Sequence, residues 1–194
     1  MTVGTVTELV RRACSKVEKE QYFRDRTNKH IGLVQNAAAK IVAAYPEFAD
    51  LLTMCRHHDA SKFCEPECSP YVELTWQHKQ DGHKNYQTPG TISDEKINQA
   101  TMHHVLNNTH HPEHWNQANA GIDPSNRNKG VKCISAAAMP PLAIAEMVAD
   151  WQAMSEELRT NTAREWYNKQ KGVRWNFSAE QDKLIDKLLK VFGV

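Results

Sequence analysis

Apolar residues recur through the first quarter of the chain at spacings of three and four residues, which is the pattern of amphipathic helices. The pattern predicts one helix over about 5–23 and a second over about 28–44, which Pro46 ends. A third helix is expected over about 47–57. Its predicted inner stripe consists of Phe48, Leu51, Leu52 and Cys55.

The rest of the chain continues the helical pattern. Further helices are predicted over about 71–80, 94–108, 140–158, 162–171 and 178–192. Pro140 and Pro141 open the third of these, since proline is tolerated in the first turn of a helix. Ser178 and Gln181 form a capping box that starts the last. No segment shows a convincing strand alternation, so we predict an all-α fold in a single domain, 1–194.

Two segments lack helical periodicity. Residues 81–90 have the composition of a loop, and residues 113–139 are rich in Asn, Gly and Pro. A loop as long as the second is uncommon in a compact domain and often has a function.

Composition narrows the class of protein. Of the 194 residues, 40% are apolar, which is enough for a core, and the mean hydropathy of −0.66 indicates a polar surface. The net charge is +1, from 24 basic and 23 acidic residues. This balance argues against a nucleic-acid polymer as partner, although it is compatible with a small anionic substrate.

The first ten residues lack the basic and apolar regions of a signal peptide, and no apolar run is long enough to span a membrane. We therefore expect a cytoplasmic protein without a membrane partner. Its five cysteines are expected to be reduced. Cys64 and Cys68 have no second pair to complete a zinc site, so a structural role is favoured for them. Whether the chain forms a homo-oligomer stays open.

Histidine supplies the candidate chemistry, since the chain has ten. The adjacent residues His58 and Asp59 lie at the predicted end of a helix, where the chain turns and both side chains can converge on one point. An imidazole nitrogen beside a carboxylate oxygen suits Zn, Mn, Fe or Co. Taken alone, such a pair is more often a solvated helix end.

Two polar residues on apolar helix faces accompany this pair. His30 precedes the apolar Ile31, where a histidine is more often a hydrogen-bonded core residue than a ligand. Asp150 lies on a largely apolar stripe, and a carboxylate there must be paired or bound to a metal if it is buried. Glu146 lies one turn earlier and repels Asp150 unless a cation lies between them. Exposure of both carboxylates to solvent is an equal alternative.

Five of the ten histidines fall between His103 and His114. His104 and His111 are two helical turns apart on one side, and His103 and His110 make a parallel pair on the neighbouring stripe. The spacing favours a second ligand set. The alternative is a surface helix that is rich in histidine.

The order of these residues along the chain resembles the HD superfamily of metal-dependent phosphohydrolases. The resemblance implies an HD-like helical bundle with a metal-site core over about 28–158 and C-terminal helices over about 162–192 packed on it. The residues implied for a first divalent ion are His30, His58, Asp59 and Asp150. Those implied for a second ion, or for phosphate, are His104 and His111, with His110 as a substitute. Glu146 is then expected beside the ligands rather than among them.

The chain also resembles a family of short bacterial and phage proteins without an assigned function. The matching stretches are "HDASKF" at 58–63, the histidine-rich segment at 103–115 and "MP…EMVADWQAMS" at 139–155. This resemblance implies the fold and the metal site but no substrate.

The HD resemblance implies a phosphohydrolase that acts on a small phosphorylated substrate, with a nucleotide or deoxynucleotide favoured by analogy. One or two ions of Mn, Co, Mg, Zn or Fe would be its cofactor, and a bridging water would lose a proton and attack phosphorus in line. Asp59 and Lys62 are the expected catalytic residues, because this lysine commonly faces the substrate phosphate in HD enzymes. Enzymes that resemble bacterial 5'-deoxynucleotidases usually carry a glutamate at this position, which argues against that activity.

Two other functions are compatible with the same residues. Some HD-fold enzymes are di-iron oxygenases, which need six protein ligands, and the histidine-rich segment allows that number. A binding or inhibitory protein that keeps the fold without turnover is the other alternative.

Overall fold

Helices dominate the computed structural model, which describes residues 6–82, 90–116 and 133–194, with side chains from residue 15 onward. The α-helices are α1 (Val6–Ala44), α2 (Leu51–Met54), α3 (Cys68–Gln80), α4 (Asp94–Asn107), α5 (Pro141–Leu158), α6 (Ala163–Gln170) and α7 (Ala179–Leu189). The 3₁₀ helices are η1 (Pro46–Phe48), η2 (Cys55–His57), η3 (Ala60–Phe63), η4 (Pro112–Trp115) and η7 (Lys190–Phe192). The predicted all-α fold class is confirmed. Within the described ranges, no helix has the length and apolar character needed to cross a membrane.

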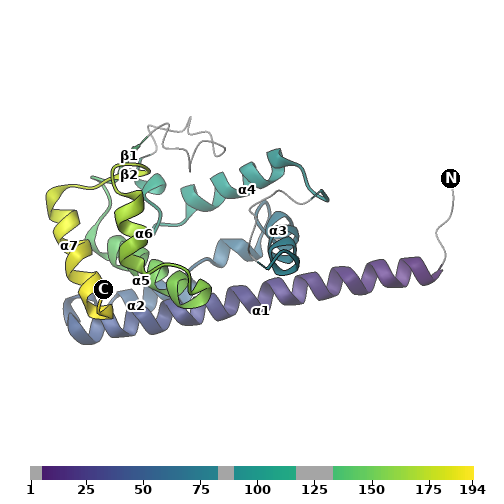
Figure 1. The fold of residues 1–194 in the computed structure, drawn as a ribbon, viewed down its shortest axis with the longest axis horizontal. Helices are drawn as coiled ribbons and strands as arrows, with labels where there is room; N and C mark the ends of the chain where they lie inside the picture. Colours follow the sequence, from purple (N-terminus) through teal and green to yellow (C-terminus); the bar gives the residue numbers. More distant parts are fainter. Residues whose placement is uncertain (1–5, 83–89, 117–132) are drawn as a thin grey trace.

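The first helix, α1, is one element of 39 residues and about 58 Å, so the prediction of two separate helices was wrong. The polar segment 24–27, where a break was expected, contains no glycine or proline to stop a helix. It is also packed, since Thr27 is buried and Arg26 forms a 2.8 Å salt bridge with Glu157 of α5. The C-terminal half of α1 packs along α5, while its N-terminal end extends beyond the other elements (Figure 1).

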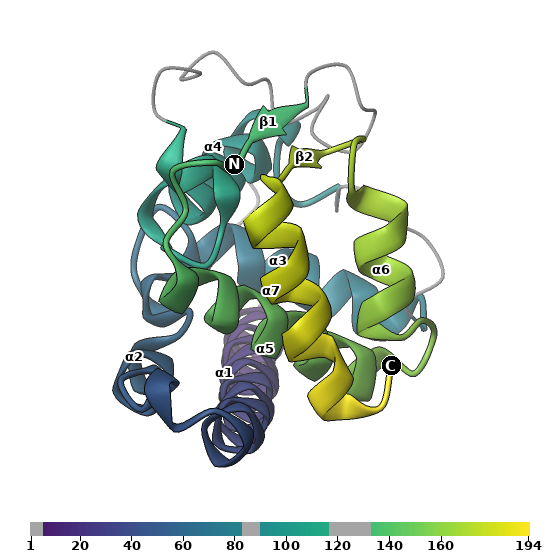
Figure 2. The same cartoon turned by 90° about the vertical axis from the view of Figure 1, so that its left-hand side faces the viewer.

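Helix α5 is the centre of the core, with α1 on one side and α6 and α7 on the other (Figure 2). The apolar residues Ile144, Met147 and Val148 of α5 are almost fully buried, as expected for a helix with neighbours on several sides. The buried apolar side chains form one cluster that extends from Val34 in α1 to Leu189 in α7. α5 therefore holds the residues of its polar stripe at a fixed place inside the molecule.

The predicted helix over 47–57 is instead a series of short turns, η1, α2 and η2. Phe48, Leu51 and Cys55 are buried as expected, but Leu52 is 40% exposed and does not belong to the inner stripe. Because these turns are short, the chain changes direction sharply before and after His58.

Two short strands were not predicted. β1 (Ile134–Ser135) pairs in parallel with β2 (Trp175–Asn176), and the amide of Ile134 donates to the carbonyl of Arg174 at 2.8 Å. Strands of two residues are too short to show alternation, which is why no sequence pattern indicated them. The first strand and η4 belong to the segment 113–139 that was expected to be least structured. Residues 117–132 of that segment and most of the predicted loop 81–90 lie outside the described residues.

Candidate metal centre

The His58–Asp59 pair occupies a sharp reversal between η2 and η3. His58 ends η2 with an extended ψ of 130°, and Asp59 has a left-handed φ of 58°. Aspartate tolerates this conformation better than most residues. Both residues are only 2% exposed. The reversal turns the two side chains toward the same buried space.

The first ligand set joins this reversal to α1 and α5. Nε2 of His30 in α1 lies 3.0 Å from Oδ1 of Asp150 in α5 and 3.9 Å from Oδ2 of Asp59. Nε2 of His58 lies 3.6 Å from Oδ2 of Asp59 and 3.8 Å from Oδ1 of Asp150. Four atoms predicted as ligands, two nitrogens and two oxygens, are therefore brought together from three parts of the chain.

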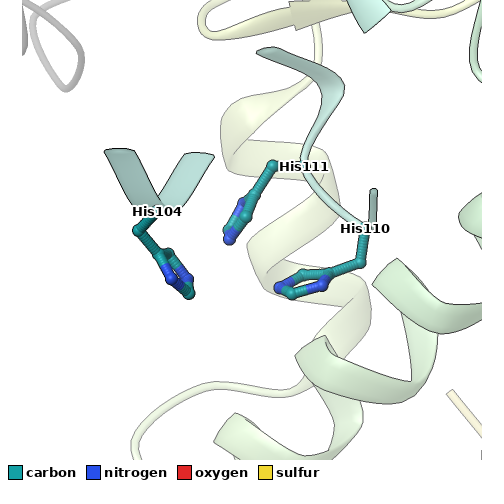
Figure 3. Close-up of side chains that lie close together, drawn as sticks. All are labelled: His104, His110 and His111. Carbon is teal, nitrogen blue, oxygen red and sulfur yellow. The ribbon is translucent and has the colours of Figure 1, made fainter. Parts of the chain in front are cut away.

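The second set comes from α4 and from the turn that follows it. The imidazole rings of His104, His110 and His111 point toward one another (Figure 3), and one nitrogen from each lies within 4.8 Å of the others. Nε2 of His104 lies 3.4 Å from Oδ1 of Asp59, and Nε2 of His110 lies 3.6 Å from the same oxygen. All three predicted histidines thus belong to the group, including His110, which was expected only as a substitute.

The two sets meet at Asp59, which turns one carboxylate oxygen toward each. Oδ2 faces His30 and His58, while Oδ1 faces His104 and His110. A carboxylate placed in this way can bind two neighbouring ions, one with each oxygen. The His58, Asp59 and His110 group, whose ligand atoms also lie within 4.8 Å of one another, spans both sets.

The spacing of these atoms fits a divalent ion. Ligand atoms about 2.1 Å from a tetrahedral ion are roughly 3.4 Å apart, and the nitrogen-to-oxygen distances in the first set run from 3.0 to 3.9 Å. Within the described part of the chain, Nε2 of His58 and Oδ1 of Asp59 are buried without a hydrogen-bond partner. Buried polar atoms without partners are rare, and a bound cation accounts for both.

The charges around the doublet also favour a cation. Burial alone would lower the pKa of His58, but the neighbouring carboxylates, Asp59 first, outweigh it and raise the pKa to about 10. Burial would raise the pKa of Asp59, yet Lys62 and the surrounding histidines hold that pKa well below its usual range. The pKa of Glu146 falls to about 2, because contacts with His110 and His58 outweigh burial. The centre therefore contains ionised carboxylates, whose negative charge needs a neighbouring positive charge.

Lys62, the other predicted catalytic residue, lies at the edge of the centre. Its Nζ donates to Oδ2 of Asp59 at 2.5 Å, and its side chain is 25% exposed while that of Asp59 is 2% exposed. Burial would lower the pKa of Lys62, but the charge of Asp59 outweighs it and raises the pKa. The lysine is therefore a cation beside the buried carboxylate and in contact with solvent.

Three glutamates lie next to the histidines, and Glu146 alone was expected beside the ligands. Glu67 of the turn before α3 and Glu146 of α5 are buried, and Glu157 at the end of α5 has a side chain that is 11% exposed. Sequence reasoning placed Glu146 beside the ligands, which agrees with its 2.9 Å contact to Nδ1 of His58. Glu67 gave no such signal, because it lies at no helical spacing from a predicted ligand. Glu157 lies two helical turns after Asp150, but that spacing alone does not distinguish it from a solvated glutamate.

His103 does not join the ligand group. Its Nδ1 lies 2.7 Å from Oε1 of Glu67, and its side chain is 36% exposed. The helical pairing of His103 with His110 fails because α4 ends at Asn107, so His110 follows a turn rather than a further helical turn.

A family model matches residues 19–191, a range that contains every residue of the centre. The chain belongs to this family of unknown function, DUF5662. No curated protein and no solved structure matches the chain. Membership in the DUF5662 family carries no activity or cofactor with it, so a function has to be argued from the centre itself.

Proposed function

We propose that this DUF5662 protein is a metal-dependent phosphohydrolase of the HD type that acts on a small phosphorylated substrate. The observation that carries the proposal is the position of Asp59 between two ligand sets that each contain histidines, with Lys62 beside it on the solvent side. Paired metal positions that share a carboxylate are typical of enzymes that hydrolyse phosphate esters.

Each part of the centre has a definite task in this proposal. His30, His58 and Asp150 would hold one ion together with Oδ2 of Asp59. The second set would hold another with Oδ1, through His104, His110 and His111. A divalent ion bound in such a site supplies Lewis acidity and a nucleophile at neutral pH.

Lys62 supplies the positive charge that the protein itself can bring to a phosphoryl group. A compact ammonium group, partly open to solvent, can contact phosphoryl oxygens that gain charge in the transition state. The Lys62–Asp59 contact also holds the amine at the edge of the ligand sets before a substrate arrives. A nucleotide or deoxynucleotide is the favoured substrate, on the strength of the HD resemblance.

The test is release of inorganic phosphate from a panel of nucleoside monophosphates by the protein reconstituted with Mn²⁺, Co²⁺ or Mg²⁺. We expect Lys62→Met to lower kcat at least tenfold while metal content is unchanged. Lys79→Met is the matched control, because Lys79 lies over the Tyr22 and Trp76 rings, away from the ligands. If the reconstituted protein releases no phosphate with any of these ions, the proposal is contradicted.

The nitrogen-rich second set favours one alternative, a di-iron oxygenase with the same ligands. Three histidines in one group suit iron, and the seven residues of the two sets exceed the six protein ligands that such a site needs. Purified protein that contains iron and consumes oxygen in the presence of a small polyol or phosphonate would decide for this alternative. Phosphate release by iron-free protein would decide against it.

A further inference from the structure

The histidines of the first ligand set turn their two ring nitrogens in opposite directions. Nδ1 of His30 lies 3.4 Å from Oε2 of Glu157, which is ion-pair distance without the alignment of a hydrogen bond, while its Nε2 faces Asp150. Nδ1 of His58 lies 2.9 Å from Oε1 of Glu146, while its Nε2 faces Asp59. In both residues a glutamate lies on the outer side of the ring and an aspartate on the inner side.

The second set repeats this arrangement from other elements. Nδ1 of His104 lies 2.9 Å from Oε2 of Glu67, and its Nε2 faces Oδ1 of Asp59. Nδ1 of His110 lies 3.6 Å from Oε1 of Glu146, and its Nε2 faces the same Asp59 oxygen. Four histidines from three separate parts of the chain therefore share one orientation.

This orientation has a direct chemical consequence. A neutral imidazole carries one N–H, and a carboxylate beside Nδ1 takes that N–H as a hydrogen-bond donor. The lone pair is then left on Nε2, which points inward. A carboxylate that accepts from the outer nitrogen of a ligand histidine fixes the ring and its tautomer and makes the inner nitrogen a stronger ligand.

Burying the charged glutamates costs free energy unless each carboxylate has a partner such as a histidine N–H. Glu67 is 0% exposed and Glu146 is 3% exposed, and an isolated charge at such a position is strongly unfavourable. Their described partners are mainly the histidines themselves. Glu157 is additionally held by the salt bridge to Arg26, which fixes its carboxylate in front of His30.

We propose that Glu67, Glu146 and Glu157 are positioning residues that preset the ligand histidines with Nε2 directed at the metal ions. The proposal rests on the metal centre of the proposed function but not on its phosphate chemistry. The three glutamates contact the histidines of different ions. Glu157 serves the first ion, Glu67 serves the second, and Glu146 serves both because it faces His58 and His110.

This division predicts a pattern that a general loss of stability would not produce. Glu157→Gln should weaken binding of one of the two ions by about 10- to 100-fold, and Glu67→Gln should weaken binding of the other by a similar factor. Glu146→Gln should weaken both. The amide keeps the size of the side chain, so the change removes mainly the charge that holds the histidine N–H.

The experiment is a Co²⁺ titration of each metal-free variant against a competing chelator, followed by the visible absorption of bound Co²⁺. Glu73→Gln is the control, because Glu73 is a partly buried glutamate that is likewise paired but has Lys19 and Thr91 as partners. It should bind both ions as the wild type does. Equal affinities in all variants, or an equal loss of both ions in Glu157→Gln and Glu67→Gln, would overturn the proposal.

A measurement on the wild type covers the case in which a variant does not fold. Long-range proton–nitrogen correlation spectra of the ¹⁵N-labelled, Zn²⁺-loaded protein should show His30, His58 and His104 protonated on Nδ1 and bound through Nε2. Binding through Nδ1 would contradict the proposal. If the wild type binds ions but hydrolyses no phosphate ester, the proposed function fails while the positioning role stands. If it binds no ion, both fail.

Discussion

Asp59 combines two properties that rarely occur in one residue, a left-handed backbone and a buried carboxylate with one oxygen toward each ligand set. The backbone turn brings His58 and Asp59 to the same space, and the two oxygens would let Asp59 bind an ion in each set. Asp150, by contrast, contacts His30 and His58 alone among the predicted ligands. Replacing Asp59 and replacing Asp150 should therefore have different effects on metal binding.

Replacing the shared aspartate should affect both ions. We expect Asp59→Asn to lower the affinity for two ions, whereas Asp150→Asn should lower that for one. Asparagine also tolerates a left-handed φ, so Asp59→Asn keeps the turn. Equilibrium dialysis against Mn²⁺ or Zn²⁺ measures both affinities. A loss of the same single ion in both variants would contradict a shared role for Asp59.

At the residue scale, burial should also determine how fast each cysteine thiol reacts. Burial raises the pKa of Cys55 to about 12, with the charges of Glu146 and Asp150 adding to the effect, whereas Cys64 is exposed. A thiol reacts as its thiolate, so Cys55 should react with Ellman's reagent only on unfolding and Cys64 within the first phase. Cys64→Ser should remove part of that fast phase. Rapid labelling of Cys55 in the native protein would be the contrary result.

The candidate ligands that the structure brings together were predictable from sequence, because metal chemistry limits ligands to a few residue types. His30 and Asp150 each interrupt an apolar helix stripe, and that interruption is visible in the sequence. Glu67 and Glu157 were not predictable, since their contacts depend on how α3 and α5 pack. A glutamate on a helix is most often a solvated residue, and only the packing distinguishes these two.

At the scale of elements, the capping signals and the helix end before Pro46 were confirmed, whereas the expected break at 24–27 was wrong. Ser178 begins α7 through the predicted capping box, with its side chain accepting from the amide of Gln181. The expected break in α1 rested on four polar residues, but polar helix formers do not stop a helix. The side-chain amide of Gln181 also donates to the carbonyls of Ala136 and Met139, a second role that sequence could not reveal.

That second role makes Gln181 a test of how α7 is anchored. Gln181→Ala removes the side-chain donor to the buried carbonyls of Ala136 and Met139. It also removes the side-chain oxygen that accepts from the Ser178 amide, which is half of the capping box. Glu165→Ala removes the equivalent half of the capping box of α6, where the side chain is exposed. We expect the first change to lower the free energy of unfolding by about 2 kcal/mol more than the second. Thermal unfolding of the metal-free variants measures the difference, and equal losses would argue against the anchoring role.

At the scale of the whole molecule, the centre connects elements that are far apart in sequence. α1, the reversal at His58, α4 and α5 each contribute a ligand, so bound ions would tie the two ends of the core region together. The family match over 19–191 includes the candidate ligands of all four. Apolar packing explains why α1 and α5 lie side by side, but it gives no reason for so many charged groups between them.

Metal removal should therefore lower the stability of the whole chain. An ion present at one hundred times its dissociation constant adds about 2.7 kcal/mol, which corresponds to a rise in Tm of roughly 5–10 °C for a chain of this size. Adding a chelator should reverse the rise in the wild type. Asp59→Asn should show little change with either treatment. A wild-type Tm that responds to neither ion nor chelator would count against a structural contribution of the centre.

The most direct test of the account is the number of metal ions per chain. Elemental analysis of the protein, after reconstitution with Mn²⁺, Co²⁺ or Zn²⁺ and removal of free ions, should give two ions per wild-type chain and less than one for Asp59→Asn. A wild-type chain that retains no divalent ion would contradict the assignment of a metal centre around Asp59.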